Sequence, residues 1–303
     1  MRIASLLASA TEMVAALGLE ERLVAISHEC DYPPSIVRKP RVSRPRFDPE
    51  GLTDAGIDAA VRDGMMRHGS PYTLDEERLR AAAPDVILAQ AVCEVCAVPT
   101  TLASEAARAL GEGIRVLSVD AHSIEEVLGS IRRLGDELGV PGRAAAVVNA
   151  LQARLTAVAT AVAGAPRPAV LAIEWLDPPF VPGHWVPEMI AVAGGTNLAG
   201  QEGRPSRQVG WEDLVGLDPD VLVVMPCGYG LPRSRRAAED HAARLRAVGP
   251  RAIASGRTWV VDGSAYFNRS GPRIADGVEI LGALLHPDRV RGVELTGRAE
   301  TWG

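Results

Sequence analysis

Four cysteines are the residues whose type and placement best suit chemistry in this sequence: Cys30, Cys93, Cys96 and Cys227. Each follows an apolar segment that is typical of a parallel strand, and none falls on an expected helix. Ligands of open parallel sheets bind beyond the carboxyl ends of the strands. We therefore predict that the four thiolates converge on one site, which would suit zinc or an iron–sulfur cluster.

Other interpretations of the same cysteines stay open. A free cysteine is often a small buried apolar residue. The spacing of Cys93 and Cys96 also fits a redox pair of the thioredoxin type, which the residues downstream permit but do not support. In a reducing compartment, we expect all four to be thiols or metal ligands and not disulfides.

Two histidine-containing loops are further candidates. His28 lies beside Cys30, and it either ligates a metal ion, cobalt included, or hydrogen-bonds the turn. His184 and Trp185 follow a Pro-Gly turn, and Trp185 either stacks on a flat ligand or packs at the edge of a lobe. The remaining histidines are interpreted as surface or capping residues: His68, His122, His241 and His286.

Irregular segments with arginine and tyrosine complete the candidates. Arg207 and Arg269 either bind an anionic group of a ligand or are solvated loop residues. Tyr229 follows Cys227 closely, and Tyr266 precedes Arg269. The sequence lacks a dinucleotide-binding fingerprint, a Walker loop, a G-x-S-x-G elbow and an H-E-x-x-H motif, so no common catalytic motif is indicated.

The elements that must position these residues alternate between strand and helix, as in parallel βα units. Strands are expected over residues 2–7, 23–27, 85–90, 116–119, 169–173 and 221–225. Capping boxes predict that helices begin at Ser9, Thr73 and Ser123. One long alanine-rich helix is predicted from Pro141 to about Val162.

The two halves of the chain share a pattern. Pro84-Asp85 precedes one apolar strand and Cys93, and Pro219-Asp220 precedes another and Cys227. Pro-Asp before a buried strand is also a common turn, but the matched cysteine offset favours a repeated lobe. We predict an N-terminal α/β lobe at 1–140, a bridging helix at 141–164 and a C-terminal α/β lobe at 165–303, each lobe with a parallel sheet flanked by helices.

The composition, with 303 residues, 47% hydrophobic and 23% charged, is that of an ordinary folded protein. Its net charge of −6 argues against a nucleic acid or an anionic membrane as partner. No apolar run reaches the roughly 18 residues of a membrane span, and no export signal is apparent. These features predict a cytoplasmic protein, unless an export sequence was removed.

Four segments in the expected order resemble a known family: residues 3–12, 193–198, 217–221 and 271–285. They resemble the class III substrate-binding proteins of ABC importers, and most of all the vitamin B12-binding subset. The resemblance implies two α/β lobes bridged by one long helix, with the ligand held in the cleft between them. It also implies a corrinoid (cobalamin-like) or related metal-chelate ligand, an ABC permease as partner, and no enzymatic activity.

The resemblance and the candidates above give one set of expected ligand-binding residues: Ser9, Thr11, His28, Tyr32, Gln90, His184, Trp185, Arg207, Tyr229, Tyr266 and Arg269. The cysteines and the missing export signal depart from typical importers. They favour an alternative, a cytosolic metal or iron–sulfur protein on the same scaffold. Its metal ligands would be Cys30, Cys93, Cys96 and Cys227.

Overall fold

The computed structural model describes residues 1–90, 98–111 and 113–303. The chain forms two compact units. Unit 1 comprises Met1–Ala121, Glu125–Val148 and Ser270–Pro272, and unit 2 comprises His122–Ile124, Asn149–Arg269 and Arg273–Gly303. The division falls inside the long helix α6 (Pro141–Ala161), whose bridging role stays a prediction.

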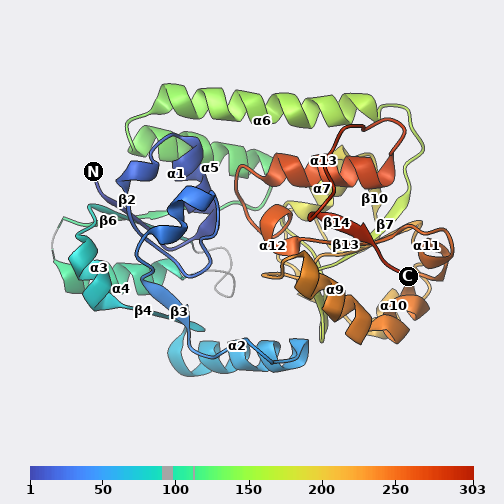
Figure 1. The fold of residues 1–303 in the computed structure, drawn as a ribbon, viewed down its shortest axis with the longest axis horizontal. Coiled ribbons are helices and arrows are strands. Elements are labelled where there is room, and N and C mark those ends of the chain that lie inside the picture. Colours follow the sequence, from blue (N-terminus) through green and yellow to red (C-terminus); the bar gives the residue numbers. More distant parts are fainter. Residues whose placement is uncertain (91–97, 112) are drawn as a thin grey trace. The chain divides into compact units, whose positions relative to one another are not determined.

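Unit 1 is built on a parallel sheet with the strand order β2-β1-β5-β6. Figure 1 labels its two edge strands, β2 and β6. Its strands are β1 (Ile3–Ser5), β2 (Leu23–Ile26), β5 (Val86–Ala89) and β6 (Arg115–Ser118), with a separate antiparallel pair β3 (Ser43–Pro45) and β4 (Tyr72–Leu74). Its helices are α1 (Ala8–Ala16), α2 (Asp54–His68), α3 (Glu76–Ala82), α4 (Thr100–Leu110) and α5 (Ile124–Glu137), with short 3-10 turns at Glu20–Arg22 and Pro34–Arg38.

Unit 2 has a second sheet with the order β10-β7-β12-β13-β14, parallel except for the edge strand β14. Its strands are β7 (Ala169–Ile173), β10 (Thr196–Asn197), β12 (Val221–Val224), β13 (Thr258–Val261) and β14 (Ala299–Thr301), and a small antiparallel sheet holds β8 (Trp175–Leu176), β9 (Pro179–Val181) and β11 (Arg207–Gln208). Its helices are α7 (Val186–Val192), α8 (Trp211–Leu214), α9 (Leu231–Asp240), α10 (Ala242–Val248), α11 (Pro250–Ala254), α12 (Gly263–Tyr266) and α13 (Ile274–Leu285).

The expected repeat of two sheets is confirmed. The strand before Cys93 is β5 and the strand before Cys227 is β12, and each is third in the order of its own sheet. Every residue of both strands is fully buried, as expected for parallel strands covered on two faces. In unit 1, one such cover is the apolar cluster in which Ala4 and Ile87 pack with Leu79 of α3 and Ala103 of α4.

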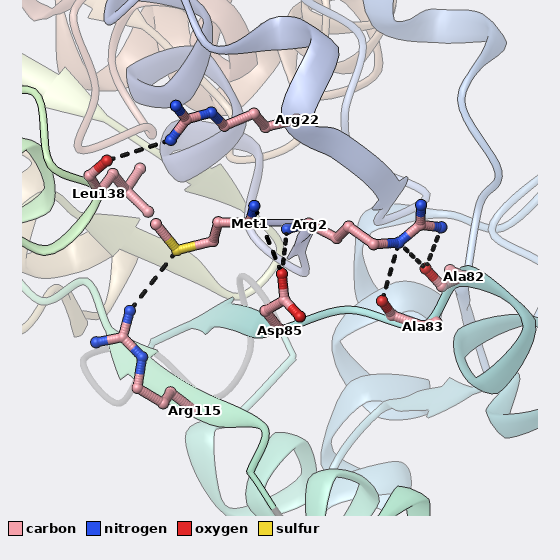
Figure 2. Close-up of polar contacts among 8 residues, drawn as sticks. All are labelled: Met1, Arg2, Arg22, Ala82, Ala83, Asp85, Arg115 and Leu138. Carbon is pink, nitrogen blue, oxygen red and sulfur yellow. Dashed lines mark hydrogen bonds and ion pairs between the residues drawn. The ribbon is translucent and has the colours of Figure 1, made fainter.

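The repeated Pro-Asp motif has a specific role at the amino edge of both sheets. The Asp85 carboxylate accepts a hydrogen bond from the backbone N–H of Arg2, just before β1, at 2.7 Å (Figure 2). The Asp220 carboxylate accepts the equivalent bond from the N–H of Ala169, the first residue of β7, also at 2.7 Å. Each aspartate therefore satisfies a strand-initiating N–H that no neighbouring strand reaches.

Other contacts hold the same edge of unit 1, as Figure 2 shows. The Arg2 guanidinium donates to the carbonyl oxygens of Ala82 at 2.8 Å and Ala83 at 3.0 Å, at the end of α3. The Arg115 guanidinium lies 3.7 Å from the Met1 sulfur. These contacts tie the starts of β1 and β6 to their surroundings in unit 1.

Two of the expected helix starts are wrong. Helix α1 begins at Ala8 with Leu7 at its N-cap, so Ser9 lies inside the helix and its hydroxyl is 3.3 Å from that of Ser270. Thr73 lies in β4, and the cap of α3 is Asp75, whose carboxylate accepts from the N–H of Arg78 at 2.9 Å. In both cases the chain enters the helix at a different residue from the polar one that the spacing indicated.

Helix α6 is the one helix among the described residues that is long and apolar enough, by length and composition alone, to cross a membrane. Of its most apolar stretch, 28% is buried. Core helices of proteins without any membrane contact pass the same test, so this finding is weak evidence for a span.

The aspartate contacts generate a stability prediction. Replacing Asp220 with alanine should lower the free energy of unfolding by about 1 kcal/mol, because the Ala169 N–H loses a charged acceptor. Asp85→Ala should cost less, since its side chain is 58% exposed and that of Asp220 is 34% exposed. Denaturant unfolding followed by tryptophan fluorescence measures both. Asp220→Asn, which keeps an acceptor oxygen, is the matched control, and an Asp220→Ala variant as stable as the parent would contradict this role.

Candidate functional site

The loop after β2 in unit 1 carries Cys30, which is buried with 1% of its surface exposed. Its sulfur lies 3.0 Å from the Thr11 hydroxyl and 3.2 Å from the Ser27 hydroxyl. Thr11 is part of α1 and Ser27 directly follows β2, so the thiol joins two segments at the carboxyl edge of the sheet. Both hydroxyls and the sulfur hydrogen-bond within the protein, which fits a structural role for this cysteine.

His28 is held by several groups of the same unit. Its Nδ1 lies 2.8 Å from the Ser43 hydroxyl, and its Nε2 lies 3.3 Å from a carboxylate oxygen of Glu29. Burial, and then the positive charge of Arg41, lower the pKa of His28 to about 4. The Arg41 guanidinium also donates to the carbonyl oxygens of Ser27 and His28. The imidazole is therefore neutral at physiological pH.

The other unit 1 candidates differ in exposure. Ser9 and Gln90 are buried, and the Gln90 carbonyl accepts from the N–H of Thr100 at 2.9 Å. Tyr32 is 44% exposed and is the only aromatic residue among the exposed large apolar side chains of the described chain. Cys93 and Cys96 lie outside the described residues.

In unit 2, the strand β7 is followed by a half-buried glutamate that the sequence analysis missed. Glu174 follows β7 directly, its N–H donates to the Phe180 carbonyl at 3.0 Å, and its own carbonyl accepts from the N–H of Cys227 at 2.9 Å. Burial raises the pKa of its side chain to about 7, although a hydrogen bond with Ser206 opposes that rise. Glu174 therefore changes its charge near neutral pH.

Ser206 connects this carboxyl group to the loop that carries His184. Its hydroxyl accepts from the N–H of Gly183 at 3.0 Å. In the same two segments, the N–H of His184 donates to the Arg204 carbonyl at 2.6 Å, and the His184 carbonyl accepts from Gly203 at 3.0 Å. The backbones approach so closely that a Cβ at Gly183 would lie 2.1 Å from the Arg204 carbonyl oxygen, so position 183 requires glycine.

The His184 side chain faces a second histidine. Its Nδ1 lies 3.2 Å from the Nδ1 of His122, and its backbone has a φ of 50°, in the left-handed region. Burial, and then the neighbouring His122, lower the pKa of His184. His122 was expected to be a surface or capping residue, whereas the structure half-buries it in this pair.

Trp185 and Tyr229 are both buried. Trp185 is 8% exposed, and its indole N–H donates to the Phe267 carbonyl at 2.8 Å. Tyr229 is 4% exposed, its ring centre lies 5.1 Å from that of Trp175, and the Arg233 guanidinium lies 4.1 Å over its ring. Both rings pack within unit 2, and ligand contact by either stays a prediction.

The remaining candidates of unit 2 are Arg207, on β11, and Tyr266 and Arg269, at or just after α12. Arg207 is exposed on β11, which pairs with β9. Arg269 is 9% exposed and donates to the Ser264 hydroxyl at 3.2 Å. The Tyr266 ring centre lies 5.5 Å from the guanidinium group of Arg273 and 5.4 Å from that of Arg298. Of these side chains, Arg207 is the most open to solvent.

The expected four-cysteine metal site is not assembled from the residues that can be described. Across 1–90, 98–111 and 113–303, no three His, Cys, Asp or Glu side chains are grouped to hold a metal ion. Cys30 belongs to unit 1, and Cys227, which is half-buried, belongs to unit 2. Convergence of all four thiols stays a prediction, because Cys93 and Cys96 lie in the part without description.

Comparison with known proteins decides the family. The sequence profile of the periplasmic binding proteins matches residues 3–256, which is most of the chain. The chain belongs to this family. The expected α/β fold with parallel strands and flanking helices is confirmed.

Individual family members are similar over most of their length. The vitamin B12-binding protein of Vibrio cholerae is 23% identical over 92% of this chain and 86% of its own. A substrate-binding lipoprotein of an ABC transporter in Bacillus subtilis is 26% identical over 95% of this chain and 80% of its own. The crystal structure of a periplasmic heme-binding protein from Pseudomonas aeruginosa superposes with a TM-score of 0.74, at 24% identity, and covers 100% of this chain and 98% of that one.

These relatives are named as binding proteins, as expected for this chain, and not as enzymes. Their names mark two of them as periplasmic or lipid-anchored, so they do not support the expectation of a cytoplasmic protein. They also give no support to an iron–sulfur cluster or zinc as cofactor.

One feature could have been found from the sequence and one could not. Glu174 obeys the same rule that singled out the cysteines, since it follows the strand at 169–173 directly. The rule was applied to cysteine and histidine and overlooked this carboxyl group. The His122–His184 pair had no signal, because contact between residues 62 positions apart depends on tertiary packing.

Glu174 generates a pH prediction. Its pKa rises from the ordinary 4.5 to about 7 on folding, so its contribution to stability is full below about pH 4.5 and is lost as the pH rises from there through 7. The loss should reach roughly 3 kcal/mol. Glu174→Gln stays neutral, so the difference in unfolding free energy between the two proteins should change across this range. Denaturant titrations at several pH values measure it, and parallel profiles would contradict a buried, protonated Glu174.

Proposed function

We propose that this protein binds a corrinoid such as cobalamin, or a related flat metal chelate such as haem, for an ABC importer. The observation that supports it most is the similarity to the Vibrio cholerae vitamin B12-binding protein over 92% of this chain, together with membership of the family. Both candidate ligands carry a metal in a broad apolar macrocycle, so both require aromatic or aliphatic contact surface and a few polar groups at the rim.

Tyr32 is the residue of unit 1 best suited to such a ligand. Its ring is 44% exposed, and it follows the loop that carries His28 and Cys30 past the carboxyl end of β2. An exposed aromatic ring can stack on a flat macrocycle, whereas a ring packed in the core cannot. The hydrogen bonds of Cys30 with Thr11 and Ser27 hold the base of this loop.

In unit 2, we assign different roles to exposed and buried candidates. Arg207 is exposed and offers a guanidinium to an anionic or amide group at the rim of the ligand. Trp185 and Arg269 are nearly buried and bonded to Phe267 and Ser264, which suits support of the loops around α12.

We also infer an ABC permease as partner, by analogy with the transporter lipoprotein of Bacillus subtilis. A binding protein of this kind works outside the cytoplasm, and we therefore propose that location in place of the cytoplasmic one. Fractionation of cells that express the complete natural gene tests it, and recovery solely with the cytosolic fraction would contradict an importer role.

Titration of the purified chain with cyanocobalamin and with hemin, followed by tryptophan fluorescence and ligand absorbance, tests the ligand. We expect saturable binding of one of the two. Tyr32→Ala should weaken it by about tenfold, since an aromatic contact contributes about 1.4 kcal/mol. Tyr32→Phe keeps the ring and should bind almost as the parent does.

The outcomes separate the candidates. Tight cobalamin binding supports the corrinoid, and tight hemin binding supports the haem alternative. Binding of neither ligand at micromolar concentrations would contradict the proposal. Equal affinities of the parent and Tyr32→Ala would contradict the assignment of Tyr32 but not the proposed ligand.

A further inference from the structure

We propose that His122 and His184 form a binding site for a divalent late transition-metal ion, Zn²⁺ or Ni²⁺, that is held by the Nδ1 atoms of both imidazoles. The two residues belong to unit 2. The site is separate in chemistry from the binding of a metal chelate, because it takes the free ion, and it does not depend on the proposed function.

The distance between the two nitrogens fits one shared ion. Zinc–imidazole bonds run about 2.0–2.1 Å, so two such ligands at a tetrahedral angle place their nitrogens about 3.3 Å apart. The observed Nδ1–Nδ1 separation is 3.2 Å, and the ring planes meet at 34°. A small rotation of either ring directs both lone pairs to one point beside the line that joins them.

Both histidines are held in place before any ion arrives. The loop of His122 is fastened by the Ile124 N–H, which donates to the Glu188 carboxylate of α7 at 2.7 Å. The backbone N–H of His184 donates to the Arg204 carbonyl, and the His184 carbonyl accepts from the N–H of Gly203. The His184 ring centre lies 5.6 Å from that of Trp185. Ligands that are already oriented lose little conformational freedom on binding.

The environment of His184 also suits metal binding. Burial lowers the pKa of this half-buried imidazole, which favours the neutral form that binds a metal ion. In the free protein, one Nδ1–H donates to the other Nδ1. When an ion binds, that ring carries its proton on Nε2 instead, and both Nδ1 lone pairs face the metal without any net release of a proton.

Two protein nitrogens leave the other coordination positions to water or to an exchangeable donor. In the described part of the chain, no third His, Cys, Asp or Glu completes the set. A closed structural zinc site has four protein ligands, whereas a site with open positions is exchangeable. The ion should therefore bind reversibly and remain accessible to a further ligand.

Calorimetric titration of the chelator-treated chain with Zn²⁺ and with Ni²⁺ tests the site. We expect one ion per chain, and at least about a tenfold loss of affinity in both His122→Ala and His184→Ala, with little further loss in the double variant. His68→Ala removes an exposed histidine of α2 and is the matched control. Circular dichroism verifies that each variant keeps the parental fold.

The unaltered protein provides a second measurement that needs no substitution. In ¹⁵N-detected histidine spectra, Zn²⁺ should shift the Nδ1 signals of two imidazoles together and leave the others in place. The proposal is overturned if neither ion binds, if both single variants bind as the parent does, or if binding is lost in Cys227→Ser and kept in the histidine variants.

Discussion

The central strands of each unit are buried on both faces, and within the sheet their backbone N–H and C=O groups are satisfied by neighbouring strands. This requirement fixes the register of β1 against β5 and of β7 against β12. Register in turn aligns the carboxyl ends, which places the segments after the strands at one edge of each sheet. Cys30, Glu174 and Cys227 lie in those segments because each of them follows a strand. No contact among the three residues is needed to place them there.

In unit 2, the polar groups at this edge form one connected series. The Glu174 carboxyl bonds with Ser206, Ser206 accepts from Gly183, and the next residue, His184, is held by the Arg204 carbonyl. Glu174, whose pKa is about 7, is therefore connected through Ser206 to the backbone segment that positions the His184 imidazole. The geometry of the His184 loop depends on a carboxyl group that the ligand need not touch.

The sequence predicted what periodicity and local chemistry control. The strands at 85–90 and 169–173 and the helix from Pro141 were expected within a few residues, because long apolar runs leave few alternatives. The errors arose where neighbouring residues suit the same local role almost equally well. Thr73 and Asp75 both suit a helix cap, and the entry of the chain from β4 selects Asp75. Strands of two residues such as β8 and β11 carry too little pattern to be recognised, and the meeting of His122 with His184 is a product of packing alone.

Each unit includes a short segment from the other half of the sequence. Ser270–Pro272 belongs to unit 1, where Ser270 meets Ser9 and Gly271 packs so closely on Ser9 that a Cβ would lie 3.3 Å from its side chain. His122–Ile124 belongs to unit 2 through Glu188. If the polypeptide were cut within α6, each fragment would therefore carry a three-residue segment that belongs to the unit of the other fragment. Neither fragment would contain all the residues of its own unit, so the two units cannot be separated by a single cut in the chain.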